Sequence, residues 1–336
     1  MEHDDPQVHD IAIVGGGPTG LYAAYYAGFR GLSTVTVDSL PALGGQITAM
    51  YPDKPIYDVA GFPSVVGREL VAGLIEQSAP FKGDHVLGES VQDLKPLDGS
   101  LFELTTDHST VIRAKAVVIT GGIGTFKPRP LPAGGAWIGR GLSYFVTSLE
   151  AHAGQDVVVV GGGDSACDWA LSLAPIARSV TLVHRRDEFR AHSHTLTLLN
   201  ESDVRVLVNS QLVELRGDKR IAEVVIRRAD GWEIVVPADE VVSALGFLAN
   251  LGPIREWGIE IASNRFVTVD SSMSTNLPGV YSAGDIADYP GKVRLISVGF
   301  GEAATAVNNA ATFIDPKAGL FPGHSSEMSE PAGIVV

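Results

Sequence analysis

The sequence predicts an α/β fold with two Rossmann-like nucleotide-binding domains, each built on a parallel central sheet. Two stretches of the chain, residues 11–37 and 157–183, repeat one pattern: a short apolar run, a glycine-rich turn, a helical segment and a second apolar run. A strand, a helix and a second strand in this order form the βαβ unit of doubly wound sheets. Because the unit occurs twice, we expect two nucleotide-binding domains.

The individual elements follow from the spacing of apolar residues and from the turn residues between them. We expect strands at 11–14 and 33–37 around a helix at 19–29, and strands at 157–160 and 179–183 around a helix at 165–176. Further strands are expected at 101–106, 110–119, 204–208, 212–216, 221–228, 233–236 and 241–246, with a last helix at about 302–313.

The order of these elements predicts that the second domain is inserted into the first. The strands at 110–119 and 241–246 both run into glycine, which is typical of the exits from two such domains. The last third of the chain, which contains Ala283-Gly284-Asp285 after an apolar run, must then rejoin the first domain. We therefore expect the first domain at 1–122 and 250–336, and the second at 123–249.

Composition and charge exclude several classes of protein. The chain has 45% hydrophobic residues, enough for two cores, and a net charge of -14, which disfavours a nucleic-acid surface. Residues 1–10 lack the basic and then apolar layout of a secretory signal, and the apolar runs are too short to cross a membrane. We expect a cytoplasmic protein. Cys167 is the single cysteine, so the chain forms no internal disulfide and no dithiol redox pair.

The first glycine-rich turn has the pattern of a dinucleotide site. Residues 15–20 read Gly-Gly-Gly-Pro-Thr-Gly; Gly15 permits a tight turn, Gly17 lets the backbone approach a pyrophosphate and Gly20 lets the helix pack closely on the strand. Asp38 ends the next strand, where a carboxylate accepts ribose hydroxyls and repels a 2′-phosphate. This pattern favours FAD or NAD over NADP; the alternative is a plain turn followed by a solvated aspartate.

The second turn differs at its ribose end. Residues 161–166 read Gly-Gly-Gly-Asp-Ser-Ala, with Ala166 at the packing position of the third glycine. The following strand ends in His184-Arg185-Arg186, with Arg190 close behind. Arginines at this position bind a 2′-phosphate by charge-assisted hydrogen bonds, which favours NADPH. A solvated basic face is the alternative interpretation. The candidate NADP contacts are Gly161, Gly163, Asp164, Ser165, Ala166, His184, Arg185, Arg186 and Arg190.

These motifs together resemble the thioredoxin reductase superfamily over nearly the whole chain. The resemblance is carried by both fingerprints, by Gly44-Gly45-Gln46, by the Tyr-Asp-Val-Ala-Gly-Phe-Pro run at 57–63, by the His-Arg-Arg cluster and by Ala283-Gly284-Asp285. Thioredoxin reductases carry a Cys-x-x-Cys before the second fingerprint, whereas residues 143–148 read Ser-Tyr-Phe-Val-Thr-Ser. Without a dithiol, reduction of a disulfide has no first acceptor in the protein, so the sequence excludes a disulfide reductase.

The subfamily that lacks the cysteines and adds a C-terminal extension is the thioredoxin reductase-like ferredoxin-NADP reductase. Its signatures resemble residues 144–146, 161–169 and 323–326. The resemblance implies a homodimer in which Tyr51 stacks on one face of the flavin and His324 of the partner subunit covers the other. The FAD contacts predicted from the fingerprint and the resemblance are Gly15, Gly17, Thr19, Gly20, Asp38, Gln46, Tyr51, Val91, Phe126, Asp285 and Ser326.

The function that the sequence favours is hydride transfer from NADPH to FAD, followed by electron transfer to ferredoxin or flavodoxin. The cofactor does the chemistry, so we expect no catalytic side chain and no metal. Residues 301–304 are expected to open a helix whose dipole stabilises the reduced flavin. Ferredoxins are usually acidic, so we expect a basic docking patch near the flavin. Its candidate residues are Lys54, Lys127, Arg129, Lys292 and Arg294.

The sequence is also compatible with two other functions. One is a general NADPH-dependent diaphorase that reduces quinones, iron chelates or another carrier. The other is a module that binds flavin and nucleotide without turnover.

Overall fold

A computed structural model describes residues 7–97, 100–122 and 124–324. The chain divides into two compact units. The first unit contains Met1–Ala49, Pro55–Thr125 and Ala249–Val336, and the second contains Met50–Lys54 and Phe126–Leu248. The second unit therefore draws a short segment, residues 50–54, from the part of the chain that the sequence assigned to the first domain.

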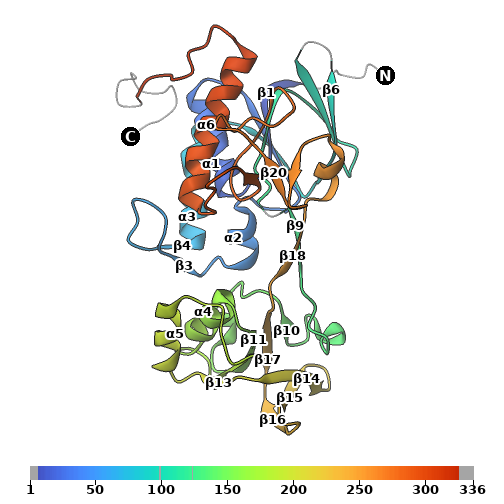
Figure 1. Cartoon of the computed structure of the whole chain (residues 1–336), viewed down its shortest axis with the longest axis vertical. Helices are drawn as coiled ribbons and strands as arrows, with labels where there is room; N and C mark the ends of the chain where they lie inside the picture. Colours follow the sequence, from blue (N-terminus) through green and yellow to red (C-terminus); the bar gives the residue numbers. More distant parts are fainter. Residues whose placement is uncertain (1–6, 98–99, 123, 325–336) are drawn as a thin grey trace. The chain divides into compact units, whose positions relative to one another are not determined.

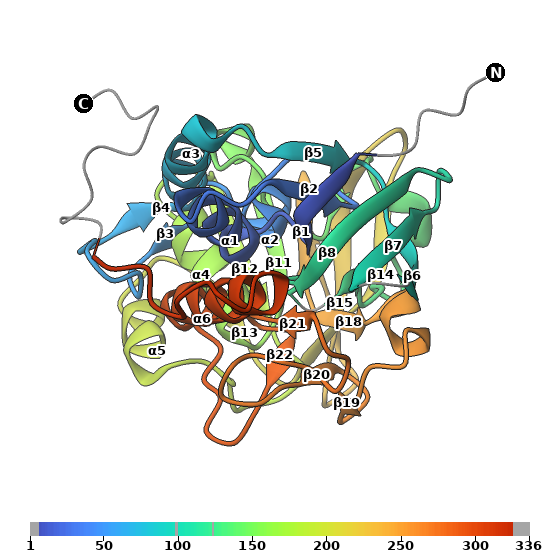
Figure 2. The ribbon, with the colours of Figure 1, turned by 90° about the horizontal axis from the view of Figure 1, so that it is seen from above.

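The first unit is built on a mixed sheet with the strand order β5-β2-β1-β8-β7-β6, and β21 also pairs with β8 (Figure 2). Strands β1, β2, β5, β8 and β21 run parallel, while β6 and β7 are added in antiparallel fashion. The bounds are β1 Val8–Val14, β2 Thr34–Asp38, β5 Asp84–Leu87, β6 Val91–Leu97, β7 Leu101–Thr106, β8 Val111–Ile119 and β21 Val280–Ser282.

Helices α1, α3 and α6 lie side by side in this unit (Figure 1). Their bounds, with those of the shorter elements, are α1 Pro18–Phe29, α2 Gly45–Met50, α3 Gly67–Ser78, α6 Ile296–Ile314, β3 Pro55–Ile56, β4 Val65–Val66, β19 Ile261–Ala262, β20 Phe266–Thr268 and β22 Ala287–Asp288. The apolar β-branched strands β1 and β8 and the alanine-rich faces of α1 and α6 form one buried core. Small side chains let the helices approach the sheet closely, which brings the ends of the parallel strands next to the helix N-termini.

The second unit repeats the doubly wound plan with an all-parallel sheet of order β10-β17-β11-β12-β13. An antiparallel sheet of β14, β15 and β16 packs with it around a second apolar cluster. The bounds are β10 Leu142–Ser143, β11 Asp156–Gly161, α4 Asp164–Leu173, β12 Ser179–Val183, α5 Ser193–Asn200, β13 Arg205–Leu207, β14 Ser210–Gly217, β15 Ile221–Arg228, β16 Glu233–Pro237 and β17 Glu240–Ala244. The predicted α/β fold class is therefore confirmed.

Two strands, β9 (Thr125–Pro128) and β18 (Phe247–Asn250), pair where the chain passes from one unit to the other. The 3-10 helices are η1 Ala79–Phe81, η2 Gly135–Trp137, η3 Glu150–His152 and η4 Gly252–Glu256. Among the residues that the structure describes, no helix combines the length and apolarity that a bilayer span requires.

The last helix begins earlier than the sequence predicted. We expected it at about 302–313, opened by residues 301–304, but α6 starts at Ile296. Two glycines in its first two turns disfavour a helix locally. Gly299 is required by packing, because an added Cβ would lie 2.5 Å from Thr19 Oγ1. Glu302 therefore lies within the helix, and the expected dipole role for residues 301–304 is wrong.

Candidate nucleotide sites

The first fingerprint joins β1 to α1 by a turn in which three backbone segments meet. A Cβ added to Gly15 would lie 2.6 Å from the carbonyl oxygen of Thr120, and one added to Gly20 would lie 1.9 Å from that of Gly15. The hydroxyl of Thr120 also donates to the Gly15 carbonyl at 2.7 Å. Side chains at either glycine would push the helix off the strand, so both positions are fixed by packing.

Gly17 lies in open space by comparison. An added Cβ would meet nothing nearer than the Cα of Gly45, at 3.9 Å. Gly45 and its neighbour Gly44 belong to the Gly-Gly-Gln turn, and the Gly44 amide donates to the Gly16 carbonyl at 2.8 Å. The two glycine turns thus form a cradle of backbone at the N-terminus of α1, which is where a pyrophosphate is bound in dinucleotide folds.

Asp38 closes the other end of this cradle. Its carboxylate accepts hydrogen bonds from the amides of Gly16, at 2.6 Å, and Leu40, at 2.8 Å. The residue is 9% exposed. This burial raises the pKa of its carboxylate, although the hydrogen bonds from the two amides lower it. Each carboxylate oxygen has one backbone donor and keeps a second lone pair for a ribose hydroxyl. The site suits a ribose and disfavours a further negative charge.

Three other residues that the sequence predicts to bind FAD lie on elements of the first unit near this cradle. Gln46 lies on α2, and its amide nitrogen would be 2.8 Å from a Cβ added to Gly122, at the exit of β8. Thr19 lies on α1, next to both Gly284 and Gly299. Val91 is 5% exposed in the core, two residues after Glu89, whose amide donates to the Asp38 carbonyl.

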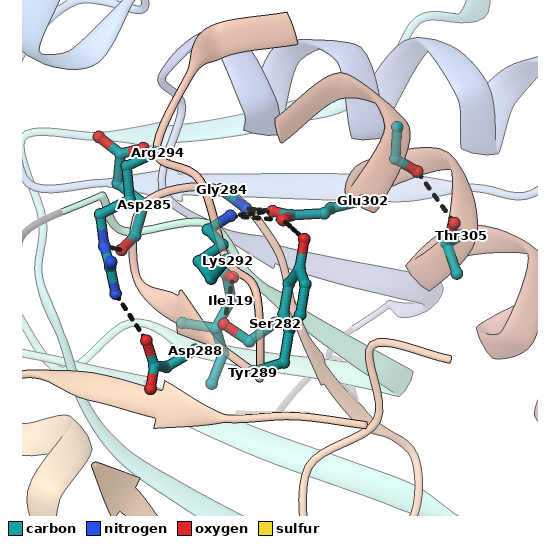
Figure 3. A network of polar contacts seen from close by, with 11 residues as sticks. Ile119, Ser282, Gly284, Asp285, Asp288, Tyr289, Lys292, Arg294, Glu302 and Thr305 are labelled. Carbon is teal, nitrogen blue, oxygen red and sulfur yellow. Dashed lines mark hydrogen bonds and ion pairs between the residues drawn. The ribbon is translucent and has the colours of Figure 1, made fainter. Parts of the chain in front are cut away.

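Asp285 lies on the turn that follows β21. Gly284 has a φ of +82° and packs against Thr19, since an added Cβ would lie 2.8 Å from Thr19 Oγ1. Figure 3 shows that the turn is connected to a buried polar network around Glu302. Burial raises the pKa of Asp285, while the positive charges of Lys292 and Arg294 lower it. The turn that carries Asp285 thus packs, through Gly284, on the first turn of α1.

The second fingerprint joins β11 to α4 with the same division of roles among its glycines. A Cβ added to Gly161 would lie 2.5 Å from the carbonyl of Ala244 and 2.7 Å from the methyl of Ala166. At Gly163 the nearest atom is the carbonyl oxygen of Arg190, at 3.9 Å. Packing therefore fixes Gly161 and Ala166, whereas the position of Gly163 is open to a ligand, as that of Gly17 is.

The loop of residues 184–192, which carries the three arginines, folds back onto this second fingerprint. Two hydrogen bonds join it to the fingerprint: the Arg190 amide donates to the Gly162 carbonyl at 2.7 Å, and the His192 amide donates to the carboxylate of Asp164 at 2.9 Å. The His184 ring packs on Gly162 and stacks on Phe189, with centroids 4.9 Å apart. The predicted cluster therefore lies beside the second cradle. Ser165 follows Asp164 in the first turn of α4.

Arg185, Arg186 and Arg190 are exposed. Within the described part of the chain, no acidic side chain forms an ion pair with any of the three. Exposed and unpaired guanidinium groups have their donors available for a phosphate. The contrast between Asp38 in the first unit and three arginines in the second is the main chemical difference between the two cradles.

The described contacts do not test four other residues that the sequence predicts to bind FAD. Tyr51 packs against the apolar cluster around α4 in the second unit. Phe126 lies on β9. His324 is exposed, with its ring edge-on to Phe321 at 5.1 Å. Ser326 lies outside the described residues. The roles of these four residues toward a flavin stay predictions.

Cys167 lies on α4 and is fully buried. Burial and the nearby carboxylates of Asp168 and Asp164 raise the pKa of its thiol to about 11. The group is therefore a neutral thiol at physiological pH and is a poor nucleophile. In the described residues, no three His, Cys, Asp or Glu side chains gather as a metal site.

Comparison with known proteins shows the family of the chain that carries these two cradles. Residues 9–310 match the model of the pyridine nucleotide-disulphide oxidoreductases. The chain belongs to this family. It is also 56% identical over 323 residues to a protein of Nocardioides sp. named ferredoxin-NADP reductase, with 95% of this chain and 97% of that one covered. A protein of the same name from Frankia alni is 56% identical over 317 residues, covering 94% and 98%.

Solved structures of family members share the fold. A thioredoxin reductase from Lactococcus lactis, described as the FR conformation, is 26% identical with a TM-score of 0.77, covering 91% of this chain and 99% of that one. A thioredoxin reductase from T. acidophilum is 27% identical with a TM-score of 0.78, covering 93% and 99%. Both comparisons support a two-domain architecture of the thioredoxin reductase type.

The sequence interpretation missed one group of residues in this family member. Glu302 and Lys292 form a buried ion pair next to the Gly284 turn. Lys292 had been placed among candidates for a basic docking patch, which is wrong because its side chain is 2% exposed. Lys54, another candidate, pairs with Asp168. A charged residue inside the apolar, alanine-rich stretch 296–314 was the available signal, because such a residue is rarely buried without a partner.

We expect Gly17→Ala and Gly20→Ala to separate folding from cofactor binding. Gly20→Ala places a methyl on a backbone carbonyl and destabilises the chain by about 1–3 kcal/mol or more. Gly17→Ala keeps the stability of the apoprotein but fills the cradle, and so weakens FAD binding at least about tenfold. Denaturant unfolding and a fluorescence titration with FAD measure the two effects. A Gly17→Ala variant that binds FAD like the parent chain would show that the cradle does not hold the pyrophosphate.

Proposed function

We propose that this chain is a ferredoxin-NADP reductase that binds FAD in its first unit and NADPH in its second. The observation that carries the proposal is the contrast between the two cradles. One has Asp38 at its ribose end, and the other has the unpaired arginines of residues 185–190. Relatives at 53–56% identity over nearly the full length carry the same name.

The first unit suits FAD. Gly15, Gly17 and Gly20 provide the pyrophosphate turn, and Asp38 provides an acceptor for the adenosine ribose. Gln46 and Asp285 supply further polar groups from α2 and from the turn after β21. Bound flavin supplies the redox chemistry, since it accepts two electrons together and releases them singly.

The second unit suits NADPH. Gly161, Gly163 and the N-terminus of α4 offer backbone amides to a pyrophosphate. Each charge-assisted bond from Arg185 or Arg186 to a 2′-phosphate contributes about 1.5–3 kcal/mol. Two such bonds correspond to a preference of roughly a hundredfold or more for NADPH over NADH. Because both arginines are exposed, salt screens part of this preference.

The acceptor is a carrier other than a protein dithiol. The only cysteine of the chain is buried, and burial raises its pKa far above neutrality. No thiol is therefore available to relay electrons to a disulfide. The remaining task of the protein is to bind, orient and exclude water, so no side chain acts as acid, base or nucleophile.

A one-electron carrier such as ferredoxin or flavodoxin fits this chemistry. Exposed basic residues that stay candidates for docking it are Lys127 and Arg129, which form no ion pair within the part of the chain that the structure describes. Arg294 is 33% exposed and pairs with Asp288. The net charge of -14 repels an acidic carrier at long range, so a local basic surface must offset it.

That net charge favours one alternative, a diaphorase that passes electrons from the same flavin to quinones or iron chelates. The two functions share both nucleotide sites and differ only in the acceptor. An experiment therefore distinguishes the two functions by the electron acceptor that the protein reduces and not by the cofactors that it binds.

A homodimer and a cytoplasmic location complete the proposal. The dimer would bring His324 of the partner subunit to the flavin, opposite Tyr51. Exposed apolar side chains at Leu320 and Phe321, 54% and 63% exposed, support a contact for the segment that carries His324.

We expect Arg185→Ala/Arg186→Ala to raise the KM for NADPH by roughly a hundredfold and to leave that for NADH nearly unchanged, because only NADPH carries the 2′-phosphate. Arg227→Ala is the control, since this exposed arginine pairs with Glu233 on the antiparallel sheet. Steady-state kinetics with both nucleotides measure the effect. Equal increases for NADPH and NADH would remove the 2′-phosphate assignment.

Adding ferredoxin should increase NADPH-driven reduction of cytochrome c at least about tenfold, because ferredoxin relays single electrons from the flavin. The assay compares ferredoxin, flavodoxin and no carrier at equal ionic strength. A rate that neither carrier changes would favour the diaphorase.

A further inference from the structure

A fully buried ion pair lies beside the turn that carries Asp285. Lys292 and Glu302 are 2% and 5% exposed, and the ammonium group of Lys292 contacts both carboxylate oxygens of Glu302. Glu302 also accepts a hydrogen bond from the hydroxyl of Tyr289 at 2.6 Å. The amide of Gly284 donates to the same carboxylate at 2.8 Å. Figure 3 shows these donors converging on Glu302.

The network connects three separate segments of the first unit. Glu302 lies on α6, Gly284 on the turn after β21, and Tyr289 and Lys292 on the segment after β22. The hydrogen bond to Glu302 and the desolvation of the phenol raise the pKa of Tyr289 to about 12, so its hydroxyl stays a donor. All donors of the network therefore act on one carboxylate, whose side chain is only 5% exposed.

The network fixes the Gly284–Asp285 turn against the first fingerprint. Gly284 packs on Thr19 of α1, and an added Cβ at Gly299 of α6 would lie 3.4 Å from the Gly284 Cα. The turn thus packs between helices α1 and α6, and the carboxylate of Glu302 accepts a hydrogen bond from its Gly284 amide. A change in the network would shift Asp285 relative to the N-terminus of α1.

Stability alone does not account for such a pair. Removing two charges from water costs about as much as their attraction returns, and well-packed apolar residues are often equally stable. A buried pair that also binds the backbone of a functional turn is better explained by positioning.

We propose that Lys292 and Glu302 are positioning residues for the flavin: Glu302 fixes the Gly284–Asp285 turn, and the charge of Lys292 keeps the Asp285 carboxylate as a hydrogen-bond acceptor. This inference rests on the proposal that the first unit binds FAD. It assigns to Lys292 an internal task in place of carrier docking.

The charges around Asp285 support this role. Burial raises the pKa of Asp285, Lys292 and then Arg294 lower it, and Glu302 raises it. Arg294 donates to the carbonyl oxygen of Asp285 at 3.2 Å and also binds Asp288. The charge of Lys292 is the largest of these charge effects, so its removal moves the pKa of Asp285 upward. The ionised carboxylate is present above its pKa and is lost as the pH falls through it.

The test is the affinity of the flavin-free full chain for FAD as a function of pH, measured by quenching of flavin fluorescence. We expect Lys292→Gln, which keeps a donor but removes the charge, to weaken FAD binding tenfold or more at pH 6 and much less at pH 9. Lys115→Gln, which breaks an exposed pair with Asp10 in the same unit, is the control and should bind like the parent chain. Asp285→Asn/Lys292→Gln should lose the pH dependence.

Circular dichroism and thermal unfolding establish that each variant is folded. If Lys292→Gln is not, Lys292→Met/Glu302→Gln replaces the pair by neutral residues of similar size, and a smaller shift in the same direction is expected. Loss of affinity that is equal at both pH values, or no loss, overturns the inference. If the parent chain itself binds no FAD, the proposed function fails instead.

Discussion

The close approach of backbone to backbone at two strand-to-helix turns constrains both nucleotide sites. In each unit, the first residue of the fingerprint lies against a neighbouring strand end, Thr120 in one case and Ala244 in the other. Each helix then begins directly at the sheet edge, with its free amides facing outward. A Cβ added at either middle position, Gly17 or Gly163, would have its nearest contact at 3.9 Å. The fold therefore makes two backbone cradles from the same steric requirement, before any side chain specifies a ligand.

In the proposed function, specificity comes from the side chains at the end of each cradle that we assign to a ribose. A buried carboxylate, held by two amides, closes the first cradle, and exposed guanidinium groups close the second. With the single thiol buried on α4, nothing in the chain offers a dithiol route for electrons. The polar network around Glu302 acts on the first cradle, because it connects helix α6, the Asp285 turn and the N-terminus of α1 in one unit.

Local patterns predicted the parts of this fold that are local. The two βαβ units were expected because glycine turns and apolar runs are adjacent in sequence, and strand β7 at Leu101–Thr106 was expected at the bounds that it has. The start of α6 was predicted six residues late, because contacts of Gly299 with Thr19 override helix propensity. Helix α3 was missed, and so was the pairing of Lys292 with Glu302, since burial of a charge depends on segments that meet only in the folded chain.

Transfer of a hydride from NADPH to a bound flavin is the central claim, and an anaerobic titration tests it most directly. The purified chain should be yellow, and its visible absorbance should fall within seconds on addition of one NADPH per flavin, with NADH far slower at the same concentration. A protein that cannot be reconstituted with flavin, or one that binds flavin and stays oxidised with NADPH, would contradict the claim.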